Sequence, residues 1–285
     1  MKKIILFIIV SIILCSCKSN DLHTTNYFSS VTIDTLLQDK ISIRALLIDK
    51  EKIWYAADQS RFGCIDLKSN QKKEIQIPAD KNREYRSIAQ TKEHIFILSV
   101  ANPALLYRIS KKDLSYELVY QETHEKVFYD SMQFWNDKEG IAIGDPTEDT
   151  FSVIVTRDGG ETWTKLLSDK LPTNATGEAA FAASNTNIAH QGTNIWIATG
   201  GKSSRIIKID YTTLKSNVYK TPFIQGESAQ GMYSIDFANQ NFGVAVGGDY
   251  TKQEANINNI ATTNDGGKTW QIQASGKNAG YTTCV

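Results

Sequence analysis

Short apolar runs recur along the chain at nearly constant intervals. The runs that align with one another are Lys52–Ala57, His94–Ser99, Gly140–Asp145, Asn194–Thr199 and Gly243–Gly248. Their first residues lie 42, 46, 54 and 49 positions apart. Runs of this length and composition predict buried β-strands, and repeats of about 40–50 residues are typical of the four-stranded blades of a β-propeller. The pattern therefore predicts five repeated sheets.

Two eight-residue segments with the form Thr-x-Asp-Gly-Gly-x-Thr-Trp occupy residues 156–163 and 263–270. Adjacent glycines permit the positive φ angles of a tight hairpin turn, and a short acidic side chain accepts hydrogen bonds inside such a turn. We expect the two tryptophans to be buried between neighbouring sheets. The residues assigned this structural role are Asp158, Gly160, Trp163, Asp265, Gly267 and Trp270.

The octamer resembles the Asp-box, or bacterial neuraminidase repeat, of sialidases, sortilin-like receptors, xyloglucanases and photosystem II stability/assembly factor-like proteins. Over residues 30–285 the resemblance is to the assembly factor-like propellers, and it is carried by residues 140–146, 177–184 and 242–249. It implies a binding propeller, because the photosynthetic members are assembly chaperones without a catalytic role. Those members bind a partner through an arginine patch, which only Arg44 and Arg86 match here.

The predicted fold class is all-β, a β-propeller of four-stranded antiparallel blades. Five blades are complete, and Gly280–Val285 reads as the start of a sixth. Val31–Leu37 also reads as a strand, of the kind that completes the last blade of a propeller. These features predict a propeller domain over residues 30–285 that is the C-terminally truncated part of a six- or seven-bladed ring.

The N-terminus has the pattern of a bacterial lipoprotein. A charged start and an 11-residue apolar stretch predict a signal peptide over residues 1–16. The sequence Leu14-Cys15-Ser16-Cys17 resembles a lipobox with Cys17 as the acylated residue, followed by a tether over residues 17–29. We therefore expect a protein of the cell envelope, anchored by lipid in the outer membrane. The sequence leaves open whether it faces the periplasm or the exterior.

The net charge argues against a nucleic-acid partner, and the cysteine content indicates free thiols. The formal net charge is zero, which provides no basic surface for nucleic acid. Beyond the signal region only Cys64 and Cys284 remain, and we expect two buried free thiols.

One polar residue stands near the start of the predicted innermost strand in each repeat. This candidate ring consists of Arg44, Arg86, Asp130, Glu178 and Gln230. One interpretation is a charged site for a protein or peptide partner. The other is a solvated ring of mutual ion pairs around a water-filled channel.

Catalytic motifs are not evident. The seven arginines lack the sialidase motif, the four histidines lack zinc spacing, and no glycine-rich nucleotide loop follows a strand. Asp145 and Asp249 follow glycines, as turn residues do, with a site role as the alternative. We therefore predict a non-catalytic scaffold without a metal or cofactor. The alternative is a glycan-binding or glycoside-hydrolysing propeller that uses Asp130 and Glu178. Some bacterial relatives are named oxidoreductases, which no motif here supports.

Overall fold

The computed structural model describes residues 30–77 and 82–285. The predicted signal peptide, the tether up to residue 29 and Cys17 lie outside the described residues. The chain divides into two compact units, Met1–Gln38 and Asp39–Val285, and all strands of the described residues belong to the second. The described parts of the chain contain no helix with the length and apolar character that a bilayer span requires.

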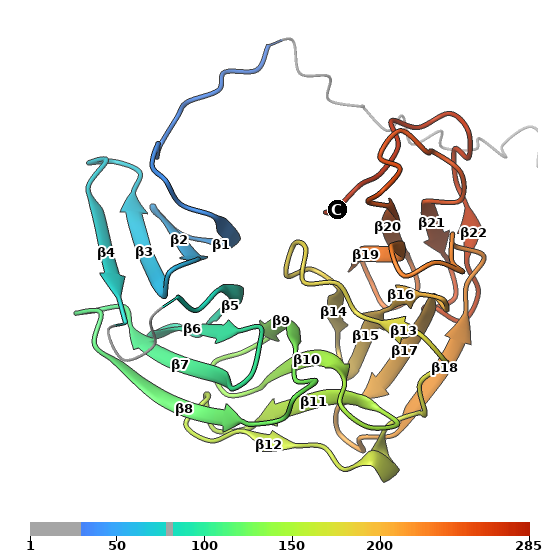
Figure 1. Ribbon diagram of the computed structural model, residues 1–285, viewed down its shortest axis with the longest axis horizontal. Coiled ribbons are helices and arrows are strands. Elements are labelled where there is room, and N and C mark those ends of the chain that lie inside the picture. The colour runs from blue at the N-terminus through green and yellow to red at the C-terminus, as the bar shows by residue number, and fades with distance from the viewer. Residues whose placement is uncertain (1–29, 78–81) are drawn as a thin grey trace, which may run out of the picture. The chain divides into compact units, whose positions relative to one another are not determined.

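Residues 39–285 form five antiparallel sheets that follow one another about a common axis (Figure 1). The strands of each sheet are given from the axis outward. The first sheet contains β1 (Ile43–Asp49), β2 (Lys52–Ala57), β3 (Arg61–Asp66) and β4 (Lys72–Gln76), and the second contains β5 (Tyr85–Gln90), β6 (His94–Ser99), β7 (Ala104–Ser110) and β8 (Tyr116–Glu122). The third contains β9 (Tyr129–Phe134), β10 (Gly140–Pro146), β11 (Phe151–Thr156) and β12 (Thr164–Lys165).

The fourth sheet contains β14 (Ile188–Gln191), β15 (Asn194–Ala198), β17 (Arg205–Asp210) and β18 (Ser216–Lys220). The fifth contains β19 (Gln230–Phe237), β20 (Gly243–Asp249), β21 (Ile260–Thr263) and β22 (Gln271–Ile272). Two short strands, β13 (Glu178–Ala179) and β16 (Gly200–Gly201), extend the fifth sheet beyond β19. A short 3-10 helix, Ser168–Lys170, follows β12.

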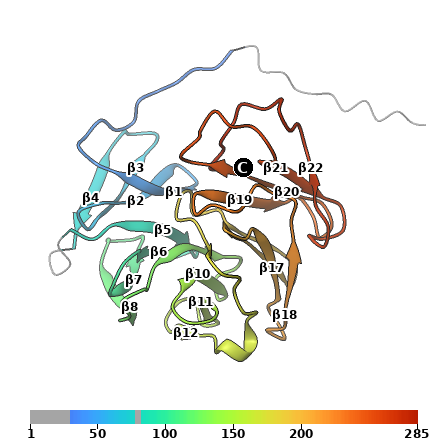
Figure 2. The same cartoon turned by 45° about the vertical axis from the view of Figure 1, so that its right-hand side comes forward.

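The five aligned runs are the second strands of the five sheets, namely β2, β6, β10, β15 and β20. Their apolar character follows from their position, because a second strand packs against a neighbouring blade on both faces in the second, third and fourth blades and on one face in the first and fifth. The prediction of a β-propeller with five four-stranded blades is therefore confirmed, and Figure 2 shows the blades turned toward the viewer.

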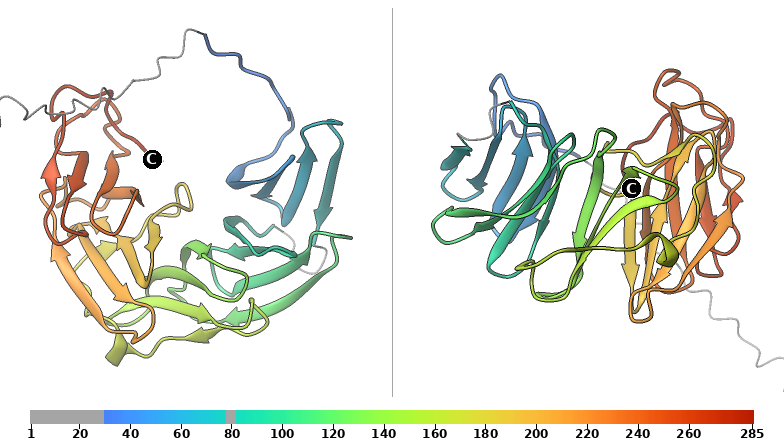
Figure 3. Two further views of the ribbon diagram at one scale, coloured as in Figure 1. Left: turned by 180° about the vertical axis from the view of Figure 1, so that it is seen from behind. Right: turned by 60° about the horizontal axis from the view of Figure 1, so that its bottom comes forward.

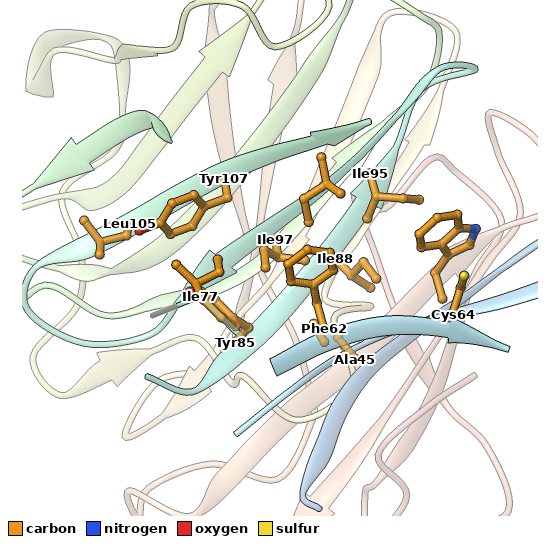
Figure 4. Packing of buried hydrophobic residues seen from close by; sticks show 13 residues of the cluster. Ala45, Phe62, Cys64, Ile77, Tyr85, Ile88, Ile95, Ile97, Leu105 and Tyr107 are labelled. Carbon is orange, nitrogen blue, oxygen red and sulfur yellow. The ribbon is translucent and has the colours of Figure 1, made fainter. Parts of the chain in front are cut away.

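The hydrophobic core is divided among the spaces between consecutive blades. The cluster between the first two blades contains Trp54, Phe62, Ile88 and Ile97, all at most 2% exposed, and Figure 4 shows its side chains interdigitating. Equivalent clusters lie between the second and third blades, the third and fourth, and the fourth and fifth. Figure 3 shows the successive blades from two further directions. Side-chain packing joins them, and between the fourth and fifth blades the pairing of β16 with β19 adds a backbone link.

Both octamers form the predicted turns. In the first, the Asp158 carboxylate accepts hydrogen bonds from Thr162 N at 3.0 Å, Thr162 Oγ1 at 2.6 Å and Thr156 Oγ1 at 2.8 Å. Asp265 accepts the same set from Thr269 and Thr263. Burial would raise the pKa of Asp265, but these hydrogen bonds outweigh it and lower the pKa to about 2.

The two tryptophans are buried between blades as predicted. Trp163 is 8% exposed and packs edge-on against Phe96 of the preceding blade. Trp270 is 6% exposed and lies in the cluster between the fourth and fifth blades. The octamers therefore act as structural turns that fix the outer hairpin of a blade against its neighbour.

We expect Asp158→Ala to lower the free energy of unfolding by about 1–2 kcal/mol, because it leaves the turn amide and two hydroxyls without their acceptor. Thermal denaturation should show a decrease in Tm of a few degrees. Asp169→Ala is the control, since that carboxylate is 68% exposed and makes only a 4.0 Å surface ion pair. An equal loss in both variants would contradict the structural role of Asp158.

Three expectations were wrong. Residues 31–37 form no strand, and Val31 and Ile33 are exposed. Residues 280–285 form no strand either, because Thr282 N donates to Gly247 O and Val285 N donates to Ser234 Oγ of the fifth blade. Cys64 is a buried free thiol, but Cys284 is exposed.

Candidate functional site

The innermost strands of four blades share a one-residue β-bulge. In β1, β5, β9 and β19 the register with the second strand skips a single residue. A bulge interrupts the alternation of side chains and re-aims the extra one. The four bulge residues are Arg44, Arg86, Asp130 and Tyr233.

Three of the bulge residues line one cavity of about 380 Å³, which we call the inner-strand cavity. It lies where the innermost strands meet the segment between β13 and β14. Its lining residues are Arg44, Arg86, Phe181, Ala182, Ala183, Tyr233, Tyr250 and Tyr281. The fold thus places two predicted site residues, Arg44 and Arg86, in the same cavity although they stand 42 positions apart in the chain.

The two arginines differ in how strongly they are already neutralised. Arg86 pairs with Glu84, with Nη2 at 3.0 Å from Oε2, and its guanidinium lies 6.0 Å from the centre of the Phe128 ring. Arg44 makes no ion pair or side-chain hydrogen bond with any residue of the 30–77 and 82–285 ranges. Arg44 is therefore the cation of the cavity that is available to an anionic group.

Aromatic rings form the opposite side of the cavity. Phe181 stacks on Tyr233 with ring centres 4.0 Å apart, and Tyr233 meets Tyr281 edge-on at 5.0 Å. Tyr233 is 2% exposed, whereas Tyr250 is 49% exposed. The stacked pair of half-buried Phe181 and buried Tyr233 provides an aromatic surface, and the exposed phenol of Tyr250 adds a hydroxyl that can donate or accept a hydrogen bond.

Asn185 holds the segment between β13 and β14 against the inner strands. Its amide nitrogen donates to Ile88 O at 2.7 Å, and its carbonyl accepts from Met132 N at 3.0 Å. One side chain thereby bridges the innermost strands of the second and third blades. Because Phe181 and Ala182 belong to the same segment, this bridge fixes one wall of the cavity.

Asp130 is buried and does not line the cavity, which corrects its predicted place in an exposed ring. The residue is fully buried, and neither carboxylate oxygen has a hydrogen-bond partner among the described residues. Burial is the main cause that raises its pKa well above the ordinary value, and the charge of Asp145 adds to it, whereas Arg86 acts in the opposite direction. Asp145 accepts a hydrogen bond from Ala180 N at 2.8 Å, and burial raises its pKa to about 6.

Glu178 is not where the sequence analysis expected it, whereas Gln230 does stand at the start of an innermost strand but does not line the cavity. Glu178 belongs to β13 in the fifth sheet, and the innermost strand of the fourth blade is β14. The buried carboxylate of Glu178 pairs with Arg205 and accepts a hydrogen bond from Thr199 Oγ1 at 2.6 Å. Gln230 is the first residue of β19 and lies three residues before the bulge residue Tyr233. Its side-chain amide donates a hydrogen bond to Asp249.

Asp249 acts in a turn, as predicted, because its carboxylate accepts from the backbone and hydroxyl of Thr251. Three aromatic residues of the cavity, Phe181, Tyr250 and Tyr281, were not among the candidate residues. The residues that follow the bulges are Ala45, Ser87, Ser131 and Ser234, each at most 2% exposed. In each of these strands a large residue is followed by a small buried one. A search for this sequence pattern would have selected Tyr233 instead of Gln230.

Comparison with known proteins supports the fold alone. No family model matches the chain, and no curated protein matches it. Among solved structures, a chain in the crystal structure of the Mitotic Checkpoint Complex is 8% identical with a TM-score of 0.61, and the match covers 87% of this chain and 69% of that one. The WD40 repeats of RRP9 are 13% identical with a TM-score of 0.56, covering 84% of this chain.

The chain spans 66% of the length of the RRP9 structure. A structure of YCF48 bound to D1 peptide is 12% identical, and the match covers 81% of this chain and 80% of that one. Its TM-score of 0.41 is too low for any comparison of sites. At these identities the similarity extends to architecture and not to residues. The chain is a β-propeller similar in fold to the WD40 propellers.

Proposed function

We propose that this protein is a non-catalytic binding propeller that takes an acidic segment of a protein or peptide partner into the inner-strand cavity. The observation that carries the proposal is Arg44, a cation without an ion-pair partner in the described parts of the chain, beside Arg86 and a wall of tyrosines. Arginine and tyrosine are the residues that contribute most to binding energy at protein interfaces. A volume of about 380 Å³ suits a few side chains or a chain end rather than a folded surface.

The octamer turns and the predicted lipid anchor support a more specific form of this proposal. In it, the protein is an Asp-box propeller of the assembly factor type, tethered through Cys17 in the cell envelope. The glycan alternative depended on Asp130 and Glu178 as facing carboxylates. Since one is buried and the other is paired with Arg205, no feature of the site favours that alternative.

We expect Arg44→Ala to weaken binding of an acidic peptide about 10–100-fold, because a hydrogen bond to a charged group contributes about 1.5–3 kcal/mol. Peptides would be selected from a random displayed library with the wild-type protein, and their Kd measured by fluorescence polarisation. Arg86→Ala should weaken binding less, because Arg86 is already paired with Glu84.

Lys68→Ala is the control for this experiment, since it removes a positive charge that is 74% exposed and outside the cavity. It should leave the Kd unchanged. The proposal fails if the selected peptides lack acidic residues, or if the double variant Arg44→Ala/Arg86→Ala binds them as tightly as the wild type.

A further inference from the structure

The fully buried carboxyl group of Asp130 and the half-buried one of Asp145 stand on the paired strands β9 and β10, and the fold does not explain why Asp130 is buried without a partner. We infer that Asp130 and Asp145 form a proton-binding pair coupled to the cavity, so that an anionic group bound at Arg86 is taken up together with a proton. This inference rests on the proposed function, and it adds that the cavity binds anions more tightly in mild acid.

Asp130 is an unusual group to place in a protein interior. It is the bulge residue of β9, it is fully buried, and both of its oxygens lack a hydrogen-bond partner among the described residues. The hydroxyls of Ser131 and Ser87, which are also buried, lack one as well. A buried carboxylate without partners costs far more than a neutral carboxyl, so the environment favours the protonated form.

The charged groups that act on Asp130 come from two neighbouring strands. Asp145 on β10 disfavours its ionised form, and Arg86 on β5 favours it. Two backbone amides, those of Asp145 and Ala182, face Asp130 and favour its ionised form without reaching hydrogen-bond geometry. Ala180 N of the segment between β13 and β14 donates to Asp145. Two carboxyl groups in such proximity titrate as a pair, and the first proton leaves more easily than the second.

Arg86 connects this pair to the cavity. It lines the cavity, it pairs with Glu84, and its charge also stabilises ionised Asp130. An anion bound at Arg86 compensates part of that charge and adds a negative charge nearby. Both effects disfavour ionised Asp130, so binding raises the proton affinity of the pair. By linkage, protonating the pair must strengthen anion binding by the same factor.

The direction of the pH effect follows from the raised pKa values. Below about pH 5 the pair is neutral, and the charge of Arg86 is opposed only by Glu84. Above about pH 7 Asp145 is ionised, since its pKa is about 6, and the cavity is less positive. We expect an anionic ligand to bind about 3- to 10-fold more tightly at about pH 5.5 than at about pH 8, within the tenfold per pH unit that one coupled proton allows.

The first test needs no ligand. The carboxyl carbons of the folded full chain, labelled with 13C at aspartate, would be followed by NMR from about pH 4 to about pH 9. The signals of Asp130 and Asp145 should titrate far above the other aspartates, and Asp145→Asn should lower the midpoint of Asp130. Arg86→Gln should raise that midpoint. If Asp130 titrates near its ordinary value of about 3.9, the pair does not exist.

The second test uses benzoate, a carboxylate on an aromatic ring, with calorimetry in two buffers of different ionisation enthalpy. Wild-type protein should take up part of a proton on binding near pH 6. The double variant Asp130→Asn/Asp145→Asn, which removes both titrating carboxyl groups, should bind benzoate with a Kd that no longer depends on pH. Asp236→Asn, which removes an exposed carboxyl of β19, should behave as wild type.

The two proposals fail in different ways. If benzoate and acidic peptides bind at no pH, the proposed function is wrong, and the NMR titration still decides whether the proton-binding pair exists. If they bind with a Kd that is independent of pH and without proton uptake, the coupling is overturned while the binding function stands. Should the double variant fail to fold, Asp145→Asn alone should reduce the pH dependence of the Kd, because it removes the carboxyl group that titrates near pH 6.

Discussion

Arg205→Ala is expected to lower the free energy of unfolding by about 3–5 kcal/mol, because it leaves the Glu178 carboxylate buried and unpaired. The Glu178 side chain is 0% exposed, and Arg205 Nε lies 2.9 Å from its Oε1. Thr199 Oγ1 donates to the same oxygen and Ala175 N donates to Oε2 at 2.9 Å, but two neutral donors cannot replace a guanidinium as the partner of a buried charge.

The measurement is urea denaturation at neutral pH, with Arg108→Ala as the control. Arg108 is similarly buried, but its partners Glu117 and Glu161 are 58% and 68% exposed, so its loss should cost no more than about 1 kcal/mol. The double variant Arg205→Met/Glu178→Gln should recover most of the stability. If Arg205→Ala is no worse than Arg108→Ala, the ion pair does not stabilise the fold as described.

This ion pair also matters for the candidate site. Glu178 immediately precedes the segment that forms one wall of the inner-strand cavity, and Arg205 Nη2 donates to Thr173 O on the other side of it at 3.0 Å. A residue that the sequence indicated as a ligand contact is therefore a fixing point for the wall that carries Phe181. Its role is to hold the site in place.

The blades could be predicted from the sequence because their causes are local. A second strand buried on both faces must be continuously apolar, so β2, β6, β10, β15 and β20 were all located to within one or two residues. The two glycine turns could also be predicted from the sequence, because the positive φ of Gly160 and Gly267 depends only on the Gly-Gly dipeptide and the hairpin that contains it.

The site could be predicted only in part because it depends on non-local contacts. Arg44 and Arg86 were predicted to lie near the start of innermost strands, and both line the inner-strand cavity. Asp130 occupies the equivalent bulge, yet Asp145 and the incoming segment with Ala182 bury it, and both are distant in the chain. The sequence analysis chose Gln230 where the structure has Tyr233 as the bulge residue of β19. A bulge shifts the strand register by one residue and leaves no sequence motif, so its position could not be predicted.

Gly160→Ala is expected to destabilise the protein by about 2–5 kcal/mol, for two reasons that can be separated. The residue has φ +82°, which costs a non-glycine residue about 1–2 kcal/mol. In addition, an added Cβ would overlap the ring of Phe96, a fully buried residue of the preceding blade, and overpacking a core costs about 1–3 kcal/mol.

The matched control is Gly276→Ala. Gly276 has φ +73°, but the nearest atom to an added Cβ is Ile257 Cδ1 at 3.7 Å, so this variant should show only the backbone cost. Chemical denaturation of both variants gives the difference due to Phe96. Equal losses would mean that the glycine is needed for its backbone angle alone.

The second octamer makes the same contact, which indicates a general rule for this chain. A Cβ on Gly267 would lie 2.8 Å from Nε1 of Trp196, and that nitrogen donates to Gly266 O at 2.8 Å. Phe96 and Trp196 are both the third residue of the second strand in the blade that precedes an octamer. Gly267→Ala should therefore destabilise as strongly as Gly160→Ala. The second glycine of each turn then serves to let a hairpin of one blade lie flat on the central aromatic ring of the blade before it.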